Sequence, residues 1–415
     1  MRVGPAAEVL AGADDLPVTD LGGDLLMPGL VDAHCHLEWS LLGGLLPPAP
    51  FAPWLGRMLA VRERMTPEAH RAAARFGALQ ALRHGTTTLA DLGPTGTGVA
   101  ALSESGQRGV VHLEAFGREA GRAATEAAAV LSARLAELDD ACGPRVRAGI
   151  APHAPYTVGP AFWRSLRRRP DLRARPWATH VAECPAELDA IRDGSGALGD
   201  LFAGAGLTPG RWPAADGDEE AEGVVPRLDV AGVLTPGLVA AHCVELRPGD
   251  AAVLAGRGVA AAHCPRSNAH LRCGRAPIEE LRAAGATVAL GTDSPASGGD
   301  YDLRAEARAC RVAHAHVHDV GDADLLRMIT TEAAAALGMA GEVGALAPGL
   351  RADLIALAPA THDAATDPET VALDPATTVH MVAVGGRELV LGGTPTELDH
   401  EGILAGAREA RGRLC

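Results

Sequence analysis

The chain has 415 residues, of which 47% are hydrophobic and 21% charged, as in a soluble globular protein with a large core. Its formal net charge of -15 argues against nucleic-acid backbones and anionic membranes as partners, because these polyanions would be repelled. There is no run of eighteen apolar residues and no basic start followed by a short apolar stretch. We therefore expect a cytoplasmic protein that acts on a small molecule.

The positions of the cysteines and the absence of lysine limit the metal sites and disulfide bonds that this chain can form. The eight cysteines are scattered without a CxxC motif, which predicts neither a thiolate zinc site nor a disulfide framework. We expect them to be small buried hydrophobic residues. The chain contains no lysine, so all 37 of its basic residues are arginines.

Residues 1–27 are apolar and turn-rich and predict one or two strands with loops. The apolar run Leu25–Val31 predicts a buried strand that leads into the sequence VDAHCHLEWS. On a strand His34 and His36 point the same way and Cys35 points the other way. Two imidazoles on one face can hold one metal ion, although a strand with two histidines on its solvent-exposed side remains the alternative for this motif alone.

The chain then alternates short apolar strands with helical segments, such as Trp54–Leu82 and Thr125–Leu138. Eight strands in this alternation predict a (β/α)8 TIM-type barrel of the α/β class over residues 28–339. Seven of them follow the histidine strand, at His84–Gly93, Arg108–Gly117, Arg145–Val158, Trp177–Glu183, Leu238–Leu246, Gly258–Asn268 and Ala286–Ser294.

Both ends of the chain have a sequence pattern that is typical of short strands joined by turns. We expect residues 1–27 and 340–395 to form one small β-sandwich domain, followed by a helical tail over 396–415. Between the fifth and sixth strands, Gly194–Val225 carries the acidic sequence DGDEE at Asp216–Glu220. This segment is expected to be solvated surface, with a lid over the active site as the alternative.

Histidine, glutamate and aspartate side chains lie at the ends of the predicted strands. In parallel barrels, active sites form at the C-terminal ends of the strands, where the loops close over that face. Imidazole and carboxylate ligands suit zinc or ferrous iron, and a position left for water makes such a site catalytic. Water on such a metal has a pKa of about 7. The residues concerned are His34, His36, His153, His180, Glu183, His242, His263 and Asp293.

Along nearly its whole length the chain resembles the amidohydrolase superfamily, and within it the metal-dependent deaminases. The motifs that carry the resemblance, all in the family's order, are PGLVDAHCH, GTTTLAD, PHAPYT, HVAE, AHCVEL, HCPRSN with LRCG behind it, GTDSPAS and PGLRADLIAL. The segment before His34 is short for this family, so we expect the β domain to lack its first strands.

The resemblance implies a role for each matching residue. One divalent metal, expected to be zinc with iron as the alternative, would be held by His34, His36, His180 and Asp293. Binuclear relatives bridge their metals with a carboxylated lysine, and a chain without lysine implies a mononuclear site. The catalytic residues would be Glu183, which shuttles a proton, Asp293, which takes a proton from the attacking water, and His242, which polarises that water or the substrate.

The resemblance also implies the reaction, hydrolytic deamination of a 6-aminopurine nucleoside-like compound. The loops look closest to the aminofutalosine deaminases of menaquinone biosynthesis, with S-adenosylhomocysteine, methylthioadenosine or adenosine as alternative substrates. Other cyclic C–N hydrolases, acting on triazine, guanine, cytosine or imidazolone rings, remain open, whereas a non-enzymatic barrel is remote because no metal ligand is missing. The candidate substrate contacts are His153, Arg57, Trp54, Arg266, Ser267 and Asn268.

The remaining histidines have simpler interpretations. His263 is expected to form only hydrogen bonds inside the barrel, and His112 with Glu114 to be a buried pair. His84 precedes a strand and is expected to be structural. The cluster His314, His316 and His318 lies on a predicted helix, where a spacing of two puts side chains on different faces, so we expect surface residues rather than a metal site. The number of subunits is open, and a homodimer is one candidate.

Overall fold

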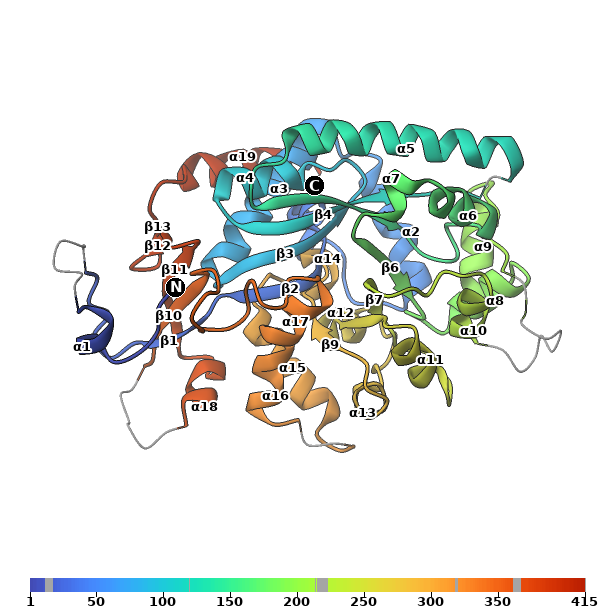
Figure 1. The fold of residues 1–415 in the computed structure, drawn as a ribbon. Helices are drawn as coiled ribbons and strands as arrows, with labels where there is room; N and C mark the ends of the chain where they lie inside the picture. The colour runs from blue at the N-terminus through green and yellow to red at the C-terminus, as the bar shows by residue number, and fades with distance from the viewer. Residues whose placement is uncertain are drawn as a thin grey trace.

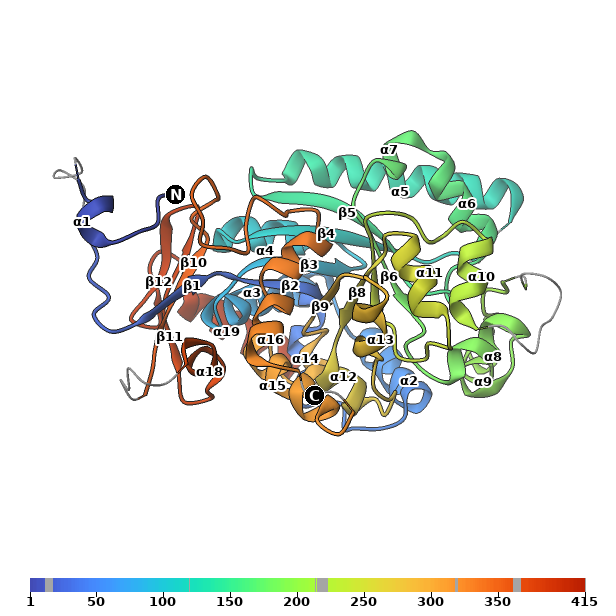
Figure 2. The ribbon, with the colours of Figure 1, turned by 60° about the horizontal axis from the view of Figure 1, so that its bottom comes forward.

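The computed structural model describes residues 1–11, 18–118, 120–212, 214, 223–317, 320–360 and 367–414. They form an eight-stranded parallel sheet in the order β2 to β9, and a five-stranded antiparallel sheet in the order β1-β10-β11-β12-β13. Figures 1 and 2 show the antiparallel sheet beside one end of the barrel, away from α8, α9 and α10. The predicted fold class, a parallel barrel with a separate sheet built from both termini, is confirmed.

Seven of the barrel strands lie within the segments that the sequence predicts, with shorter bounds, and the first strand is shifted toward the His-x-His motif. Nearly every residue in them is buried, which explains their continuous apolar runs. Their bounds are β2 Leu30–Cys35, β3 Thr86–Gly93, β4 Arg108–Ala115, β5 Val146–Pro152, β6 Trp177–Val181, β7 Leu238–His242, β8 Ala260–His263 and β9 Val288–Leu290.

The apolar run Leu25–Val31 is not one strand, as the sequence predicts, but is divided between the two sheets. Its first part, β1 Leu25–Pro28, pairs with β10 of the antiparallel sheet, whereas Leu30 begins β2 of the barrel. Gly29 lies at the crossing, where an added β-carbon would stand 2.3 Å from the Thr87 side chain. Close packing against Thr87 therefore requires glycine at this point.

The helices cover the outside of the barrel and are shown in Figure 1. The helix predicted over Trp54–Leu82 is two helices, because Thr66 caps the second by accepting a hydrogen bond from the Ala69 N–H. After β2 come the 3-10 helix η1 Leu37–Leu42, α2 Phe51–Arg62 and α3 Pro67–Arg83. The helices that follow β3 to β5 are α4 Gly98–Ser105, α5 Gly121–Ala141, α6 Pro160–Arg168 and α7 Pro170–Arg173.

The later loops of the barrel carry shorter helices. Those after β6 to β8 are α8 Ala186–Arg192, α9 Gly196–Gly204, α10 Val224–Val230, α11 Asp250–Gly256, α12 Pro265–His270 and α13 Ile278–Ala283. Those after β9 are α14 Pro295–Gly298, α15 Leu303–His314, α16 Asp322–Met328 and α17 Thr331–Ala336. The terminal segments add α1 Ala6–Val9, α18 Pro368–Leu373 and α19 His400–Gly412.

Small side chains fill the inside of the barrel. Residues such as Ala33, Ala90 and Ala262 form one buried cluster with Leu337 and Met339, which follow α17. The segment around α17 thus packs against this inner layer, while larger residues pack between the strands and the outer helices. The candidate active-site residues lie at the opposite end of the barrel, at the C-terminal ends of the strands.

The antiparallel sheet joins β1 to four strands near the C-terminus. These are β10 Leu354–Ala358, β11 Thr378–Val384, β12 Arg387–Leu391 and β13 Thr394–Pro395. Arg108 at the start of β4 forms a buried ion pair with Asp353 next to β10, with Nε and Oδ2 2.9 Å apart. We propose the domain limits at residues 27, 339 and 395 as the sequence predicts them. Among the described residues, no helix is both long and apolar enough to cross a membrane.

Candidate metal centre and active-site cavity

The barrel closes at the seam where the His-x-His motif meets Asp293. The His36 N–H donates to the Asp293 carbonyl at 2.9 Å, and the Asp293 N–H donates to the His34 carbonyl at 3.0 Å. These backbone bonds place Asp293 Oδ1 3.4 Å from His36 Nε2 and 3.9 Å from His34 Nε2. The closure of the fold thus brings together residues about 260 positions apart in the chain.

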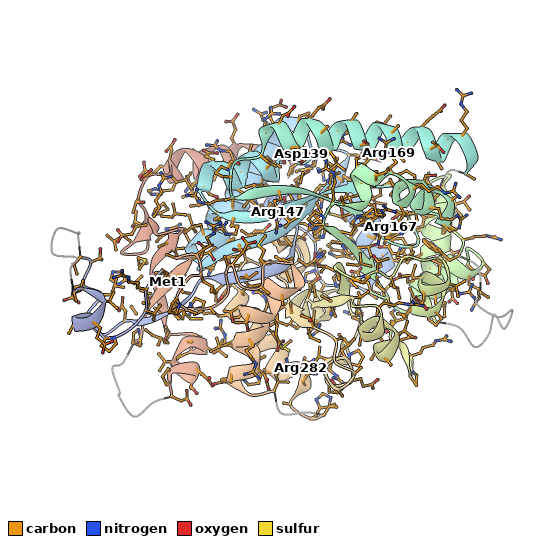
Figure 3. The ribbon with its side chains drawn as sticks, in the orientation of Figure 1. Met1, Asp139, Arg147, Arg167, Arg169 and Arg282 are labelled. Carbon is orange, nitrogen blue, oxygen red and sulfur yellow. The ribbon has the colours of Figure 1, made fainter. Side chains whose placement is uncertain are left out.

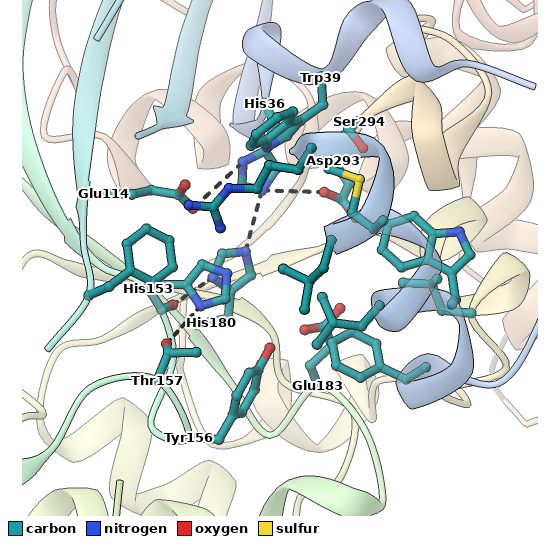
Figure 4. Close-up of a pocket in the computed structure, with 18 of the residues that line it drawn as sticks. His36, Trp39, Glu114, His153, Tyr156, Thr157, His180, Glu183, Asp293 and Ser294 are labelled. Atoms are coloured by element: carbon teal, nitrogen blue, oxygen red, sulfur yellow. Dashed lines mark hydrogen bonds and ion pairs between the residues drawn. The ribbon is translucent and has the colours of Figure 1, made fainter. Parts of the chain in front are cut away.

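His180, near the end of β6, completes a cluster with His34 and His36, whose ligand atoms all lie within 4.8 Å of one another. Its Nε2 is 3.3 Å from His36 Nε2 (Figure 4). The Nδ1 atoms of His36 and His180 face the carbonyl oxygens of Leu92 and His153 at 2.9 and 2.6 Å. This pattern leaves each Nε2 atom with a free lone pair aimed at the cluster, as in metal sites.

The cluster has unsatisfied nitrogen atoms that a cation would satisfy. The His34 side chain is fully buried, and neither of its ring nitrogens has a hydrogen-bond partner. Burial, followed by the nearby His36, holds the pKa of His34 well below its usual range, so the ring is a neutral ligand. Three imidazoles and one carboxylate are a donor set that suits a divalent metal. These residues therefore fit the single-metal site that the sequence predicts.

Glu183 and His242 lie beside this cluster. Glu183 Oε1 is 3.5 Å from His242 Nε2, and both side chains are almost fully buried. Burial, followed by the charge of Asp293, raises the pKa of the Glu183 carboxyl well above its usual range. A carboxyl group in such surroundings can hold a proton at neutral pH and give it up to a substrate.

A chain of hydrogen bonds on the Nδ1 side of the ring, the side away from Glu183, orients His242. Its Nδ1 is 3.0 Å from Asn268 Oδ1, and Asn268 Nδ2 is 3.3 Å from His263 Nδ1. With the amide assigned this way, Asn268 accepts the Nδ1–H of His242 and donates to His263. His242 Nε2 consequently carries a lone pair toward Glu183 and the cluster.

Asp293 is held from behind in a similar way. Ser267 Oγ and Ser297 Oγ donate to its Oδ2 at 2.5 and 3.0 Å, which leaves Oδ1 for the histidines. The sequence proposed Ser267 and Asn268 as substrate contacts. The structure places both behind residues of the site, where they position Asp293 and His242.

The backbone is strained around the centre. Among the described residues, five that are not glycine have a positive φ, and they include Ala182, His242 and Asp293, with φ values of 50°, 70° and 56°. Such conformations cost of order 1 to 3 kcal/mol each and persist only where the surrounding structure imposes them. Their concentration at the ends of β6, β7 and β9 supports this region as a functional site.

A cavity of about 320 Å³ opens in front of the cluster and is drawn in Figure 4. His36, His180, Glu183, His242 and Asp293 face it. The rest of its wall is mainly aromatic and aliphatic, and includes Trp39, Phe51, Trp54, Leu55, Met58, Phe116, Tyr156, Phe202, Leu207 and Leu271. A cavity of this size and character suits a small ligand with an aromatic ring.

Two of the predicted substrate contacts reach this cavity. Trp54 lines it from α2, and His153 lines it from the end of β5. The His153 ring stacks on Phe116 with centroids 4.9 Å apart, and its Nδ1 is 2.9 Å from Thr157 Oγ1. Burial lowers the pKa of His153 to about 3, so it is a neutral hydrogen-bonding group.

The two arginines proposed from the sequence do not reach the cavity. Arg57 is exposed on α2 and is absent from the lining, and Arg266 is paired with Glu306 and Asp300. Arg62 and Arg118 line the cavity instead. Arg62 lies 5.5 Å from the Phe116 ring centroid, and Arg118 lies 5.6 Å from that of Phe202. No sequence motif marks either arginine.

Glu114 is a functional candidate that the sequence analysis left as a buried pair with His112. It lies on β4, faces the cavity, and places Oε1 3.9 Å from His36 Nδ1. Burial, followed by the charge of Glu38, raises its pKa to about 8. Its position at the C-terminal end of a barrel strand was the signal that could have identified it.

The structure corrects the prediction of a surface cluster at His314, His316 and His318. His316 is exposed, but His314 is fully buried and packs edge-on against His263, with ring centroids 5.6 Å apart. Arg275 Nη1 is 2.7 Å from His314 Nδ1. His318 lies outside the described residues.

Part of the segment Gly194–Val225 borders the cavity. Phe202 of α9 and Leu207 after it contribute to its wall. The acidic sequence Asp216–Glu220 lies outside the described residues, so the choice between solvated surface and lid stays a prediction.

A closed parallel barrel with three histidines and one aspartate clustered beside a cavity defines the class of metal-dependent barrel hydrolases. Comparison with known proteins gives the family. The family model described as "Amidohydrolase family" matches residues 25–389. The chain therefore belongs to the amidohydrolase family, and it is a hydrolase of carbon–nitrogen bonds.

Individual relatives agree with this family. A 5-methylthioadenosine/S-adenosylhomocysteine deaminase of Pelotomaculum thermopropionicum is 36% identical over 366 residues, which cover 86% of this chain and 77% of the relative. A zinc-bound adenosine deaminase of Xanthomonas campestris has a TM-score of 0.78 and 27% identity, with 94% of this chain and 86% of that chain covered.

A third similarity concerns the fold alone. The aminofutalosine deaminase of Helicobacter pylori, solved with methylthio-coformycin, has a TM-score of 0.77 at 21% identity, with 94% and 92% of the two chains covered. Zinc in a solved relative and the histidine cluster here together support a divalent metal in this chain.

Proposed function

We propose that the protein hydrolyses the 6-amino group of an adenosine-like nucleoside and releases ammonia. The observation that carries this proposal is the placement of Glu183, a buried carboxyl 3.5 Å from His242, on the same cavity as the histidine cluster. Deamination needs a group at this position that moves protons between the ring and its substituent. The names of the relatives, which are nucleoside deaminases, support the same reaction.

The proposed metal ligands are His34, His36, His180 and Asp293. The ion, when bound, would supply a Lewis acid that lowers the pKa of water to about 7. We propose zinc, because a solved adenosine deaminase of this fold contains it, with iron as the alternative.

Three side chains of the protein would bind the attacking water and transfer the protons. The unpartnered Nε2 of His242 faces the centre and would accept a hydrogen bond from the attacking water. Asp293 would take a proton from that water, while Glu183 would protonate the ring nitrogen next to the carbon that bears the amine. Protonation makes this carbon electrophilic. Glu183 would then take the remaining proton of the added hydroxyl and pass it to the amine as the C–N bond breaks, and the proton held by Asp293 would return to Glu183, so that the products are a ring carbonyl and ammonia.

The cavity has separate regions for the two ends of such a substrate. We propose that the purine lies among the aromatic side chains near Glu183, where His153 donates or accepts a hydrogen bond. Arg62 and Arg118 on the cavity wall would attract a negatively charged group at the far end of the nucleoside.

For the substituent, we propose a 5′-substituted adenosine of the S-adenosylhomocysteine or methylthioadenosine type. The names of relatives such as that of Pelotomaculum support this choice. Aminofutalosine, which the sequence suggested first and which would belong to menaquinone biosynthesis, remains the second candidate. Its benzoate would also suit Arg62 and Arg118, but the similarity to the aminofutalosine deaminase concerns the fold alone.

An ammonia-release assay tests the proposal. Zinc-loaded protein is given S-adenosylhomocysteine, methylthioadenosine, adenosine, aminofutalosine, guanine, cytosine and a chlorinated triazine in parallel. We expect one of the first two compounds to have the highest kcat/KM. The matched control is protein stripped by a chelator and then reloaded, which should lose and regain activity. Fully loaded protein that deaminates none of the nucleosides would refute the proposed reaction.

A further inference from the structure

A second cavity, of about 420 Å³, lies at the end of the barrel opposite to the active site. Its wall is formed where the strands begin, by Arg147 of β5, Trp177 of β6 and Leu238 of β7, together with residues 335–338 that end α17 and follow it. Four arginines line it, namely Arg147, Arg167, Arg173 and Arg175. Figure 3 labels Arg147 beside the barrel strands and Arg167 near α6.

Most of these arginines have no acidic partner. Arg175 is neutralised by Asp139, with Nη1 3.0 Å from Oδ1. By contrast, no carboxylate among the described residues lies within ion-pair distance of Arg147, Arg167 or Arg173. The buried Arg108, by comparison, is paired with Asp353.

Arg167 is partly buried although it lacks a counter-charge. Its guanidinium stacks on Trp177, with Cζ 4.1 Å from the ring centroid, and Nη2 donates to Thr235 Oγ1. Its Nε is buried without a hydrogen-bond partner. Burial, followed by the charge of Arg173, lowers the pKa of Arg167 to about 10. The guanidinium is therefore held at the cavity in a fixed orientation and is repelled by its neighbour.

His112 provides an independent sign of a missing ligand. Its side chain is 1% exposed, lines the same cavity, and has an Nδ1 without a hydrogen-bond partner. Gly149 makes room for this ring, because a β-carbon there would lie 2.6 Å from His112 Cδ2. Three arginines without an acidic partner and one buried imidazole nitrogen without a hydrogen-bond partner thus line the same cavity.

We propose that this cavity is an anion-binding site for a small molecule that carries two or more linked phosphate groups. Guanidinium groups bind phosphate oxygens in pairs of parallel hydrogen bonds, and three unpaired arginines match a multivalent anion better than a single phosphate. The volume is that of a small-ligand pocket. Inorganic pyrophosphate and a nucleoside diphosphate share this chemistry. The site is separate from the proposed active site and does not depend on its function.

Isothermal titration calorimetry at constant ionic strength tests the proposal with pyrophosphate, ADP and inorganic phosphate as probes. The metal-loaded protein is compared with the double variant Arg147→Gln/Arg173→Gln. Both substituted side chains are exposed and hold no ion pair among the described residues, so the fold should survive. Arg164→Gln is the matched control, because Arg164 is an exposed arginine of α6 outside the cavity.

We expect wild-type protein and the control to bind pyrophosphate or ADP, and the double variant to bind at least about tenfold more weakly. Equal affinity for pyrophosphate and ADP would show that the phosphates alone are recognised, whereas binding of ADP only would identify a nucleotide site. Deamination without added anion should be the same in all three proteins. The proposal is refuted if the wild type binds neither diphosphate. It is also refuted if the double variant binds as tightly as the wild type, since the anion would then occupy another site, such as the metal centre.

Discussion

Glu183 is 4% exposed, and its Oε1 lies 3.5 Å from His242 Nε2. At the scale of single residues, the site consists of side chains that face the cavity and of side chains that orient these by hydrogen bonds without lining the cavity. Glu183 and His242 belong to the first kind, and Asn268 and Ser267 to the second. The two kinds should respond differently to substitution.

Glu183→Gln keeps the size of the side chain but removes its capacity to carry a proton. We expect kcat to fall by about a hundredfold to ten-thousandfold, as for the loss of a general acid–base group. Metal content, measured by plasma mass spectrometry, should be unchanged. Glu245→Gln, an exposed glutamate after β7, is the control. A Glu183→Gln variant with a nearly normal rate would remove the proton-shuttle role.

Asn268→Leu removes the acceptor that holds the Nδ1–H of His242. We expect kcat to fall by about tenfold to a hundredfold, as for other residues behind a metal site. KM should change little, because Asn268 does not line the cavity. Asn268→Asp, which keeps the acceptor oxygen, should restore part of the rate. Nitrogen-15 NMR of the histidines should show an altered His242 tautomer in the leucine variant, and an unchanged spectrum and kcat would contradict the positioning role.

At the scale of elements, the strands and the short segments after them place the active-site groups, while the outer helices support those segments. The clearest example is η1, which follows the His-x-His motif. Its Glu38 is fully buried and accepts hydrogen bonds from the backbone of Thr95, Gly96 and Thr97, just before α4. A carboxylate at this point also suits the positive end of the α4 dipole.

Glu38→Ala should therefore destabilise the protein by about 3 kcal/mol, because it leaves the buried Gly96 N–H, two partly buried N–H groups and the nearby His70 without this partner. Urea unfolding followed by circular dichroism measures this loss. Glu104→Ala, which breaks an exposed ion pair with Arg75, should change the free energy of unfolding by less than about 0.5 kcal/mol. Equal effects of the two substitutions would show that Glu38 does not anchor this loop.

At the scale of the whole molecule, packing and the buried ion pair between Arg108 and Asp353 attach the antiparallel sheet to the barrel. Arg108 of β4 donates to both oxygens of Asp353, at 2.9 and 3.3 Å. The Gly385 N–H, between β11 and β12, donates to the same carboxylate at 2.7 Å. The pair therefore connects three segments that are distant in sequence.

Asp353→Ala leaves the Arg108 charge buried without its partner, and we expect a loss of about 3 to 5 kcal/mol in the free energy of unfolding. The variant should melt at a lower temperature and be cleaved faster near the antiparallel sheet by a protease. Glu397→Ala, which removes an exposed pair with Arg387, serves as control. Since Asp353 is remote from the cavity, kcat at low temperature should be retained, and a variant as stable as the control would contradict this role for the pair.

The local sequence was sufficient to predict the barrel and the strand ends at which the candidate metal ligands lie. Each barrel strand is a short apolar run, and strand periodicity with the barrel rule puts eight candidate side chains at the strand ends, whereas the choice of His34, His36, His180 and Asp293 as ligands came from the resemblance to the family. Apolar runs and strand periodicity are properties of neighbouring residues, which the chain carries without reference to distant contacts.

Only the tertiary structure decided which other residues reach the two cavities. Arg62 and Arg118 face the active site, whereas Arg57 and Arg266 do not, because the pitch of α2 and the ion pairs of Arg266 direct these side chains elsewhere. His314 is buried because α15 packs it against His263. The run Leu25–Val31 divides at Gly29 because Thr87 leaves no room for a side chain there. Each of these outcomes depends on contacts between segments far apart in the chain, which local patterns do not encode.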